Sequence, residues 1–251
     1  MRALTQVWFF FLALTFLFLL LGFHLAGRAG LFIAFLVSVI LVYATLQRGI
    51  TLFKKKLNAH EFSGNDPSGF LTELNKNKLN FGFRKIYVYK TSHKTPPLIW
   101  KSKANEGHIL LHEQLLDNLN TEEIRLSALF LLAHLENRSF LVTPILSVIN
   151  QSLLNLKILV LPVSILITTL FRIPRDILES DKKFKLTSDA SHHETGYLIN
   201  KLHNFDFHHN KKVLGTEYFS VLSISHGSLN QYGIPSLESR LKHLMGFSLS
   251  K

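Results

Sequence analysis

The sequence of 251 residues contains no cysteine. This absence excludes disulfide frameworks, thiolate-bound zinc or iron–sulfur sites, and thiol nucleophiles. Acidic residues are few: 17 Asp and Glu stand against 28 Lys and Arg, and the formal net charge is +11. A positive surplus of this size is typical of proteins that meet nucleic acid or an anionic lipid surface. Since only 18% of the residues are charged and 47% are hydrophobic, the placement of the apolar residues decides between these partners.

The basic residues do not follow the pattern of a nucleic-acid binder. Patches rich in Lys and Arg at 54–56, 182–185 and 211–212 are far apart in the sequence and lack interleaved aromatic residues for base stacking. We therefore expect no nucleic-acid partner, and we expect these charges to face solvent or lipid headgroups.

Two long uncharged runs open the chain. Residues 7–26 read VWFFFLALTFLFLLLGFHLA, and about twenty apolar residues of helix cross a hydrocarbon layer of ~30 Å. A short joint around Arg28 leads to a second run, residues 31–46. The alternative is a cleaved signal peptide, but the first run is longer than a signal core and a second follows almost at once. Residues 1–50 are therefore predicted to form a transmembrane two-helix hairpin.

The basic residues around these runs indicate an orientation. Arg2 precedes the first run, whereas Arg48 and residues 54–56 follow the second. The positive-inside rule then places both ends of the hairpin in the cytoplasm. We expect an integral, multi-pass membrane protein, of the bacterial inner membrane, whose main domain at 57–251 is cytoplasmic and has the lipid bilayer as a partner.

A third apolar segment, residues 140–173, interrupts this domain. It is shorter than the forty or so residues that two complete spans need, and a single crossing would put the two halves of the domain on opposite sides. We expect a membrane-associated hairpin that re-enters or lies in the interface. A buried pair of core helices is the alternative.

The remaining patterns predict an α+β domain with a small sheet. Helical spacing covers 69–78, and the alternation in 83–89 indicates a strand with one wet face. Further strands are expected at 98–102, at a sheet edge after two prolines, and at 109–111. Thr121, followed by two glutamates, is predicted to cap a central helix that is apolar on most sides.

In this order the features resemble the HtpX-type membrane zinc metallopeptidases. The matching phrases are LLDNLNTEEIRLSALFLLAHLENR at 115–138, LTSDAS at 186–191 and IPSLESRLKHL at 234–244. The resemblance covers most of the chain and implies a mostly helical, zincin-like domain behind a membrane hairpin. It also implies where a zinc site would be: HExxH on the central helix, with a third ligand four residues before the Asp of a Glu-x-x-Ala-Asp stretch.

The residues at those places differ from the family's motif. HExxH needs two histidines four apart and a glutamate between them to take a proton from zinc-bound water. Here the five positions read His134-Leu135-Glu136-Asn137-Arg138, and the third ligand, counted from Asp189, is Lys185. Ile234 stands where the terminal motif of the family has His. Because Leu cannot act as a base and Arg and Lys are cations, we predict no catalytic residue, no metal and no zinc cofactor.

Two cations at ligand positions suggest a replacement for the metal. Arg138 and Lys185 would repel each other unless an acid joined them. We predict that a polar or ionic cluster, in place of zinc, connects the central helix to the helix that carries Lys185. The candidate acids are Glu136, Glu179, Asp181 and Asp189.

These predictions favour a catalytically inactive pseudoprotease that binds or regulates another protein at the cytoplasmic face. Active relatives hold substrate as a strand added to the sheet edge, and an edge strand binds peptides through main-chain hydrogen bonds. The residues expected to bind a peptide are Ile99, Trp100, His108 and Ile109. The partner is expected to be a protein or peptide, such as a membrane-protein segment or an active protease.

Two other functions remain open. One is an active zinc metalloendopeptidase with non-standard ligands, drawn from His134, Glu136 and a histidine-rich stretch at 192–209. The other is a structural membrane scaffold. We interpret the histidine-rich stretch as surface histidines in polar, loop-like surroundings. Its members are His192, His193, Glu194, His203, Asp206, His208 and His209.

Overall fold

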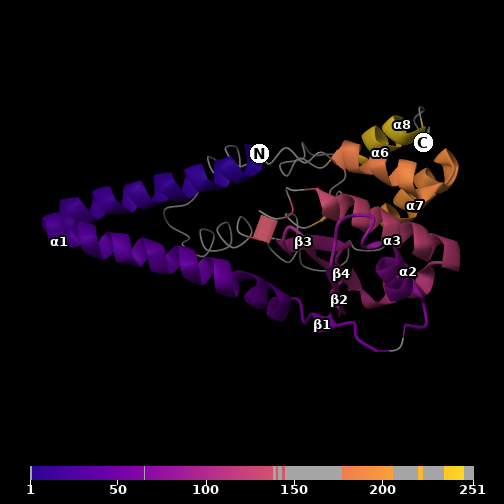
Figure 1. The fold of residues 1–251 in the computed structure, drawn as a ribbon, viewed down its shortest axis with the longest axis horizontal. Coiled ribbons are helices and arrows are strands. Elements are labelled where there is room, and N and C mark those ends of the chain that lie inside the picture. Colours follow the sequence, from indigo (N-terminus) through magenta and orange to yellow (C-terminus); the bar gives the residue numbers. More distant parts are fainter. Residues whose placement is uncertain are drawn as a thin grey trace.

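The computed structural model describes residues 2–64, 66–137, 140, 143–144, 177–205, 220–222 and 235–245. A long N-terminal helix, α1, is followed by a domain of helices and strands (Figure 1). The elements of the domain, in chain order, are β1 (His60–Glu61), α2 (Phe70–Asn77), β2 (Lys85–Thr91), β3 (Leu98–Lys103), β4 (Glu106–His112), a 3₁₀ helix (Glu113–Asn118), α3 (Thr121–Glu136), α6 (Ile177–Ser188), α7 (His192–Asn204) and α8 (Leu237–Met245). The chain is therefore an α+β protein with an apolar N-terminal helix.

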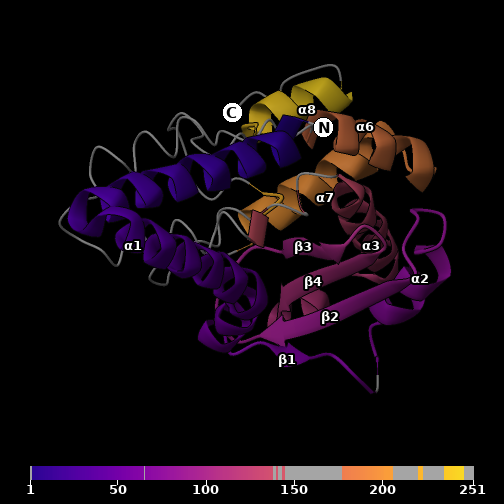
Figure 2. The same cartoon turned by 60° about the vertical axis from the view of Figure 1, so that its left-hand side comes forward.

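Helix α1 (Arg2–Lys56) is folded back on itself at Ala26 and Gly27, whose backbone angles are not helical. Figures 1 and 2 both show its two arms running away from the domain and returning to it. The two arms lie very close together where they cross. A Cβ atom on Gly30 would lie only 2.0 Å from the carbonyl oxygen of Gly22. Small residues at four-residue spacing, Gly22, Ala26, Gly30 and Ala34, permit this approach.

The surface of α1 is apolar and largely exposed. Among the residues that the structure describes, one stretch, Phe18–Ile40, is long and apolar enough to cross a membrane, and 11% of that window is buried. This stretch includes the turn at Gly27. One candidate membrane helix near the N-terminus is thus present.

The sheet has four strands in the order β1-β2-β4-β3. β2 and β4 are parallel, and the other neighbours are antiparallel. β3 lies at an edge, as expected for the strand that follows Pro96 and Pro97. One face of the sheet contributes Val88, Ile99 and Ile109 to the hydrophobic core, together with most of α3.

Helix α3 is the central buried helix that the sequence predicts, but its cap differs. Asn120, not Thr121, is the N-cap, and its side chain and that of Glu123 form a reciprocal capping box. The predicted strand at 83–89 begins two residues later, because Phe83 is buried and its N–H donates to the carbonyl of Lys78 in the preceding turn. Apart from three residues, the predicted membrane segment 140–173 lies outside the described residues.

Candidate functional site

Three buried side chains from three helices meet where the central helix ends. His134 lies in the last turns of α3, Asp181 in α6 and Arg240 in α8. The His134 Nε2 atom is 3.0 Å from Asp181 Oδ1, and Arg240 Nε donates to Asp181 Oδ2 at 2.7 Å. Arg240 Nη2 donates to the other carboxylate oxygen, so the ion pair is bidentate. We call these three residues the buried ionic cluster.

The backbone and side-chain pattern explains why these polar groups point inward. Asp181 shares the buried stripe of α6 with Ile177, Phe184 and Ser188, at helical spacing. Arg240 lies beside Leu241 on the buried side of α8. Each helix therefore carries a charge into its own apolar face, which is tolerated only because the opposite charge meets it.

Both nitrogens of His134 are engaged. Nδ1 is 2.9 Å from the carbonyl oxygen of Phe130, which requires a proton on Nδ1. Nε2 lies between the Asp181 carboxylate and Arg240 Nη2, which is 3.3 Å away. This nitrogen can donate to the carboxylate from a charged ring, or accept from the guanidinium as a neutral one. Both ring nitrogens therefore have a hydrogen-bond partner within the protein, whether the ring is charged or neutral.

The carboxyl of Asp181 is held ionised. Burial alone would raise its pKa, but the charge of Arg240 and the hydrogen bond from His134 outweigh burial and hold the pKa well below the usual range. Arg240 also donates from Nη1 to the carbonyl of Val221 at 2.7 Å. The guanidinium is thus surrounded by an imidazole, a carboxylate and a carbonyl.

The other residues predicted at motif positions of α3 lie apart from this cluster. Leu135 is fully buried against Gly107 of β4, where a Cβ on the glycine would lie 2.2 Å from a Leu135 methyl group. The side chain of Glu136 is partly exposed and pairs with Lys183. Its carbonyl accepts a hydrogen bond from the buried Lys101 at 2.7 Å. Position 135 is therefore occupied by packed hydrocarbon.

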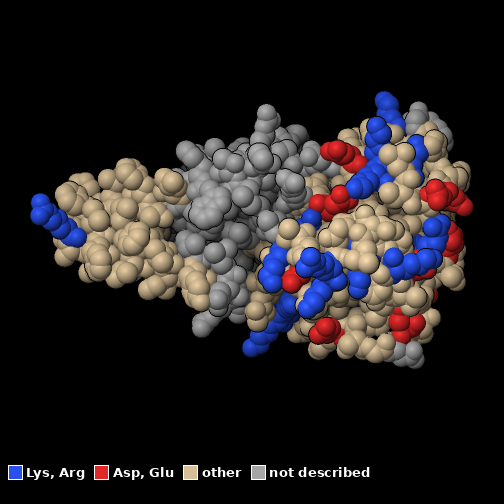
Figure 3. Space-filling view, in the orientation of Figure 1, with Lys and Arg blue, Asp and Glu red and all other residues tan. Residues whose placement is uncertain are grey.

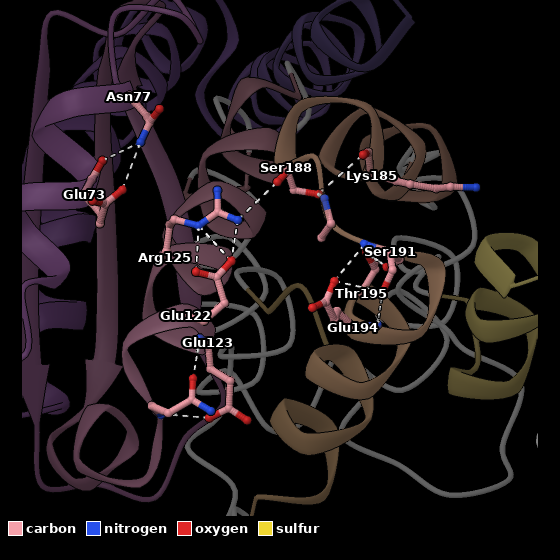
Figure 4. A network of polar contacts seen from close by, with 12 residues as sticks. Glu73, Asn77, Glu122, Glu123, Arg125, Lys185, Ser188, Ser191, Glu194 and Thr195 are labelled. Atoms are coloured by element: carbon pink, nitrogen blue, oxygen red, sulfur yellow. Dashed lines mark hydrogen bonds and ion pairs between the residues drawn. The ribbon is translucent and has the colours of Figure 1, made fainter.

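Lys185 does not join the buried ionic cluster. Its Nζ lies 3.1 Å from His192 Nε2 and 3.4 Å from the carbonyl of Leu244. In Figure 4 the Lys185 side chain extends away from α3, and exposed Asp189 ends the helix in the left-handed backbone region. Of the four candidate acids, two connect α3 to α6. Asp181 lies against His134 and pairs with Arg240, and Glu136 pairs with Lys183. Arg138 and Ile234 lie outside the described residues.

Surface contacts fasten the other end of α3. Arg125 Nη2 donates to the carbonyl of Ser188 at 3.3 Å and pairs with Glu122 (Figure 4). Lys201 of α7 donates to both carboxylate oxygens of Glu123, the residue that completes the capping box. These contacts and the buried ionic cluster hold α3 against α6, α7 and α8 at both of its ends.

The four residues expected to bind a peptide lie inside the protein. Ile99 and Ile109 are fully buried in the core under α3. Trp100 and His108 are buried on the opposite sheet face, where their rings stack 5.2 Å apart. A peptide added to β3 would therefore meet main-chain groups of this strand rather than these side chains.

The second sheet face receives the end of α1. Phe53 packs edge-on against Trp100, and Lys54 Nζ donates to the Tyr89 hydroxyl at 2.7 Å. Tyr87 and Tyr89 of β2 also stack with His108, on the side of β4 away from β3. Helix α1 is thus joined to the sheet through stacked rings, which we call the aromatic ladder: Tyr87, Tyr89, Trp100 and His108.

Acidification is expected to weaken this ladder. Burial and the nearby charge of Lys54 lower the pKa of His108 to about 4, against about 6.5 in an unfolded chain. The unfolded state then binds more protons between these values, so stability is complete above about pH 6.5 and falls towards pH 4. We expect about 2 kcal/mol less stability from this group at pH 5 than at pH 7.

Urea unfolding at both pH values measures this difference. His108→Phe keeps a ring in the stack and should lose most of the pH dependence. The matched control is His60→Phe, at an exposed position in β1. An unchanged difference between pH 7 and pH 5 in His108→Phe would contradict the prediction.

The histidine-rich stretch is helical over its first part, contrary to the loop-like interpretation. Ser191 and Glu194 form a capping box that starts α7. His192 and His193 are exposed in the first turn, whereas His203 is buried near the end of the helix. Asp206, His208 and His209 lie outside the described residues. In the part of the chain that the structure describes, no three His, Asp or Glu side chains gather as a metal site would need.

Comparison with known proteins leaves the family of this chain open. No family model, no curated protein and no solved structure matches it. The likeness to the HtpX-type peptidases therefore rests on the order of the sequence features alone.

Proposed function

We propose that this chain is a membrane-anchored, catalytically inactive homologue of HtpX-type zinc metallopeptidases, which binds a protein partner and does not cleave it. The observation that carries the proposal is the bidentate Asp181–Arg240 ion pair closed over His134. His134 is the one motif ligand that the sequence keeps.

The guanidinium of Arg240 supports the proposal by its position. It lies within hydrogen-bonding distance of the Val221 carbonyl, of His134 Nε2 and of Asp181, and the last two are ligand types that a zinc ion would use. A permanent cation there repels a dication and already neutralises the carboxylate. The ion pair would then supply the connection between helices that the metal supplies in active relatives.

Leu135 supports the same conclusion from the position of the general base. Hydrolysis needs a carboxylate that takes a proton from water. A leucine packed on Gly107 offers no proton acceptor.

Membrane anchoring is supported by the exposed apolar surface of α1. Large side chains such as Phe16, Phe32 and Ile40 are about half exposed or more along both arms. A surface of this kind needs lipid or another protein to cover it. We propose that the two arms cross the bilayer as a hairpin, with the domain on the cytoplasmic side, because Lys54–Lys56 follow the second arm.

Partner binding is proposed for the outer edge of β3. An edge strand presents main-chain N–H and C=O groups that a peptide can pair with. At one end of this edge, Leu98 already forms an antiparallel bridge with Ser220 of the same chain. A peptide would therefore add towards the other end, beside Ser102 and Lys103, whose side chains are exposed.

Metal analysis of the full-length protein tests the proposal. After purification in a neutral detergent with added zinc and gel filtration, we expect far less than one zinc per chain. Peptide cleavage should be absent and insensitive to chelator. One zinc per chain that disappears in His134→Ala, or cleavage abolished by chelator, would instead favour the active peptidase with displaced ligands.

A further inference from the structure

The end of α1 places several lysines around its junction with the domain. Lys54, Lys55 and Lys56 form its last turn, and the Thr91 hydroxyl at the end of β2 donates to the carbonyl of Leu57 at 2.5 Å. Lys90, the neighbour of Thr91, lies opposite His60 in the β1–β2 register. We call Lys54, Lys55, Lys56 and Lys90 the foot cluster.

Two members of the foot cluster are fixed by aromatic rings. Lys54 Nζ lies 4.1 Å above the Tyr89 ring, and Lys90 Nζ lies 3.7 Å above Phe62. Lys55 and Lys56 are exposed. The cluster thus combines two held cations with two that face outward.

Charge is distributed unevenly between the arms and the domain. Figure 3 shows α1 free of charge along its visible length except at its far end, whereas Lys and Arg side chains crowd the edge of the domain where the arm returns. Exposed Glu61, opposite Tyr89, contributes one opposing charge against four lysines. The foot cluster is therefore a region of positive potential.

The spacing along α1 places this region just outside the layer of lipid headgroups. The second uncharged run ends at Leu46, and the helix rises about 12 Å from there to Lys54. Headgroups occupy roughly 5–7 Å beyond the hydrocarbon on each side, and the Debye length at physiological salt is about 8 Å. A lysine side chain at this height reaches the phosphate layer.

We propose that the foot cluster binds the headgroups of anionic phospholipids and thereby fixes the domain against the membrane surface. This inference rests on the membrane anchoring proposed above. It adds the class of lipid, since a zwitterionic headgroup has no net charge to attract the lysines. Lys54 also contacts Tyr89, so lipid binding at the foot acts directly on the aromatic ladder of the sheet.

Short-chain lipids test the inference on the full-length protein in dodecyl maltoside. Trp8→Phe leaves Trp100, buried at the foot of α1, as the fluorescence probe of thermal unfolding. Dioctanoyl phosphatidylglycerol should raise the unfolding midpoint, and the rise should shrink in high salt. Dioctanoyl phosphatidylcholine and inorganic phosphate should have little effect.

A matched pair of charge reversals completes the test. Lys55→Glu with Lys56→Glu should weaken the phosphatidylglycerol effect at least tenfold in half-maximal concentration, on the order of 1 kcal/mol per lysine near an anionic surface. Lys182→Glu with Lys242→Glu, at exposed sites on α6 and α8, should leave it unchanged. Equal effects of the two lipids, or equal losses in the two variants, would overturn the inference. Carbonate washing of membranes tests the anchoring separately. Protein that stays in the washed membranes is still anchored, so a missing phosphatidylglycerol effect would then count against the foot cluster alone.

Discussion

Replacement of Arg240 by Met is expected to lower the free energy of unfolding by about 3–5 kcal/mol. The methionine fills similar volume, but it leaves the Asp181 carboxylate buried with His134 as its remaining partner. The cost is that of an uncompensated charge in a low-dielectric interior. Urea unfolding in detergent, followed by Trp100 fluorescence in the Trp8→Phe background, measures the change.

Two further variants identify the ion pair as the cause. Lys242→Met removes the same charge from an exposed position two residues along α8, and its effect should stay within about 0.5 kcal/mol. Asp181→Leu combined with Arg240→Met removes both charges and should cost less than Arg240→Met alone. If the double variant were less stable than the single one, the buried charge would not be the reason.

Acid titration gives an independent check on Asp181. Its pKa in the folded state lies below the value of about 4 in an unfolded chain, so its contribution is complete above about pH 4 and is lost as the pH falls further. The wild-type protein should lose stability steeply below pH 4. Asp181→Asn should start lower at pH 7 and show a shallower fall.

The sequence predicted the fold class well because its signals are local. Alternating residues located the strands, two prolines located the edge strand, and a nearly all-apolar helix could only be central. The cap of α3 was missed by one residue, although Asn120 and Glu123 have the three-residue spacing of a capping box and Thr121 does not. The same spacing, Ser191 to Glu194, marks the start of α7.

The site was harder to predict because it depends on contacts across the chain. The sequence indicated His134 and an ionic contact between helices, with Asp181 among four candidate acids, but it named Arg138 and Lys185 as the cations, and Lys185 lies elsewhere. It did not indicate that Arg240, the arginine of the phrase at 234–244, meets His134, since 106 positions separate the two residues. A usable signal existed: Asp181 and Arg240 each occupy a position where their helix otherwise shows apolar residues, and two such misplaced opposite charges favour a buried pair.

Replacement of Gly30 by Leu is expected to separate the two arms of α1. Any Cβ at this position meets the backbone carbonyl of Gly22 at 2.0 Å, and a backbone atom cannot turn aside as the tip of a side chain can. Overpacking of this kind typically costs about 1–3 kcal/mol, and the close crossing of small residues would be lost. Because the chain has no cysteine, single introduced cysteines report the result cleanly.

In the parent protein, cysteines at Ala3 and at Lys55 should both react with a membrane-impermeant maleimide from one side only, as a hairpin requires. In Gly30→Leu, a smaller fraction of the protein should have both cysteines labelled from the same side, or less protein should be found in the membrane. Ala29→Leu is the matched control, since Ala29 is exposed next to Gly30 and the added methyl groups meet lipid. Labelling of the two cysteines from opposite sides in the parent protein would mean that α1 crosses once, and the hairpin would have to be abandoned.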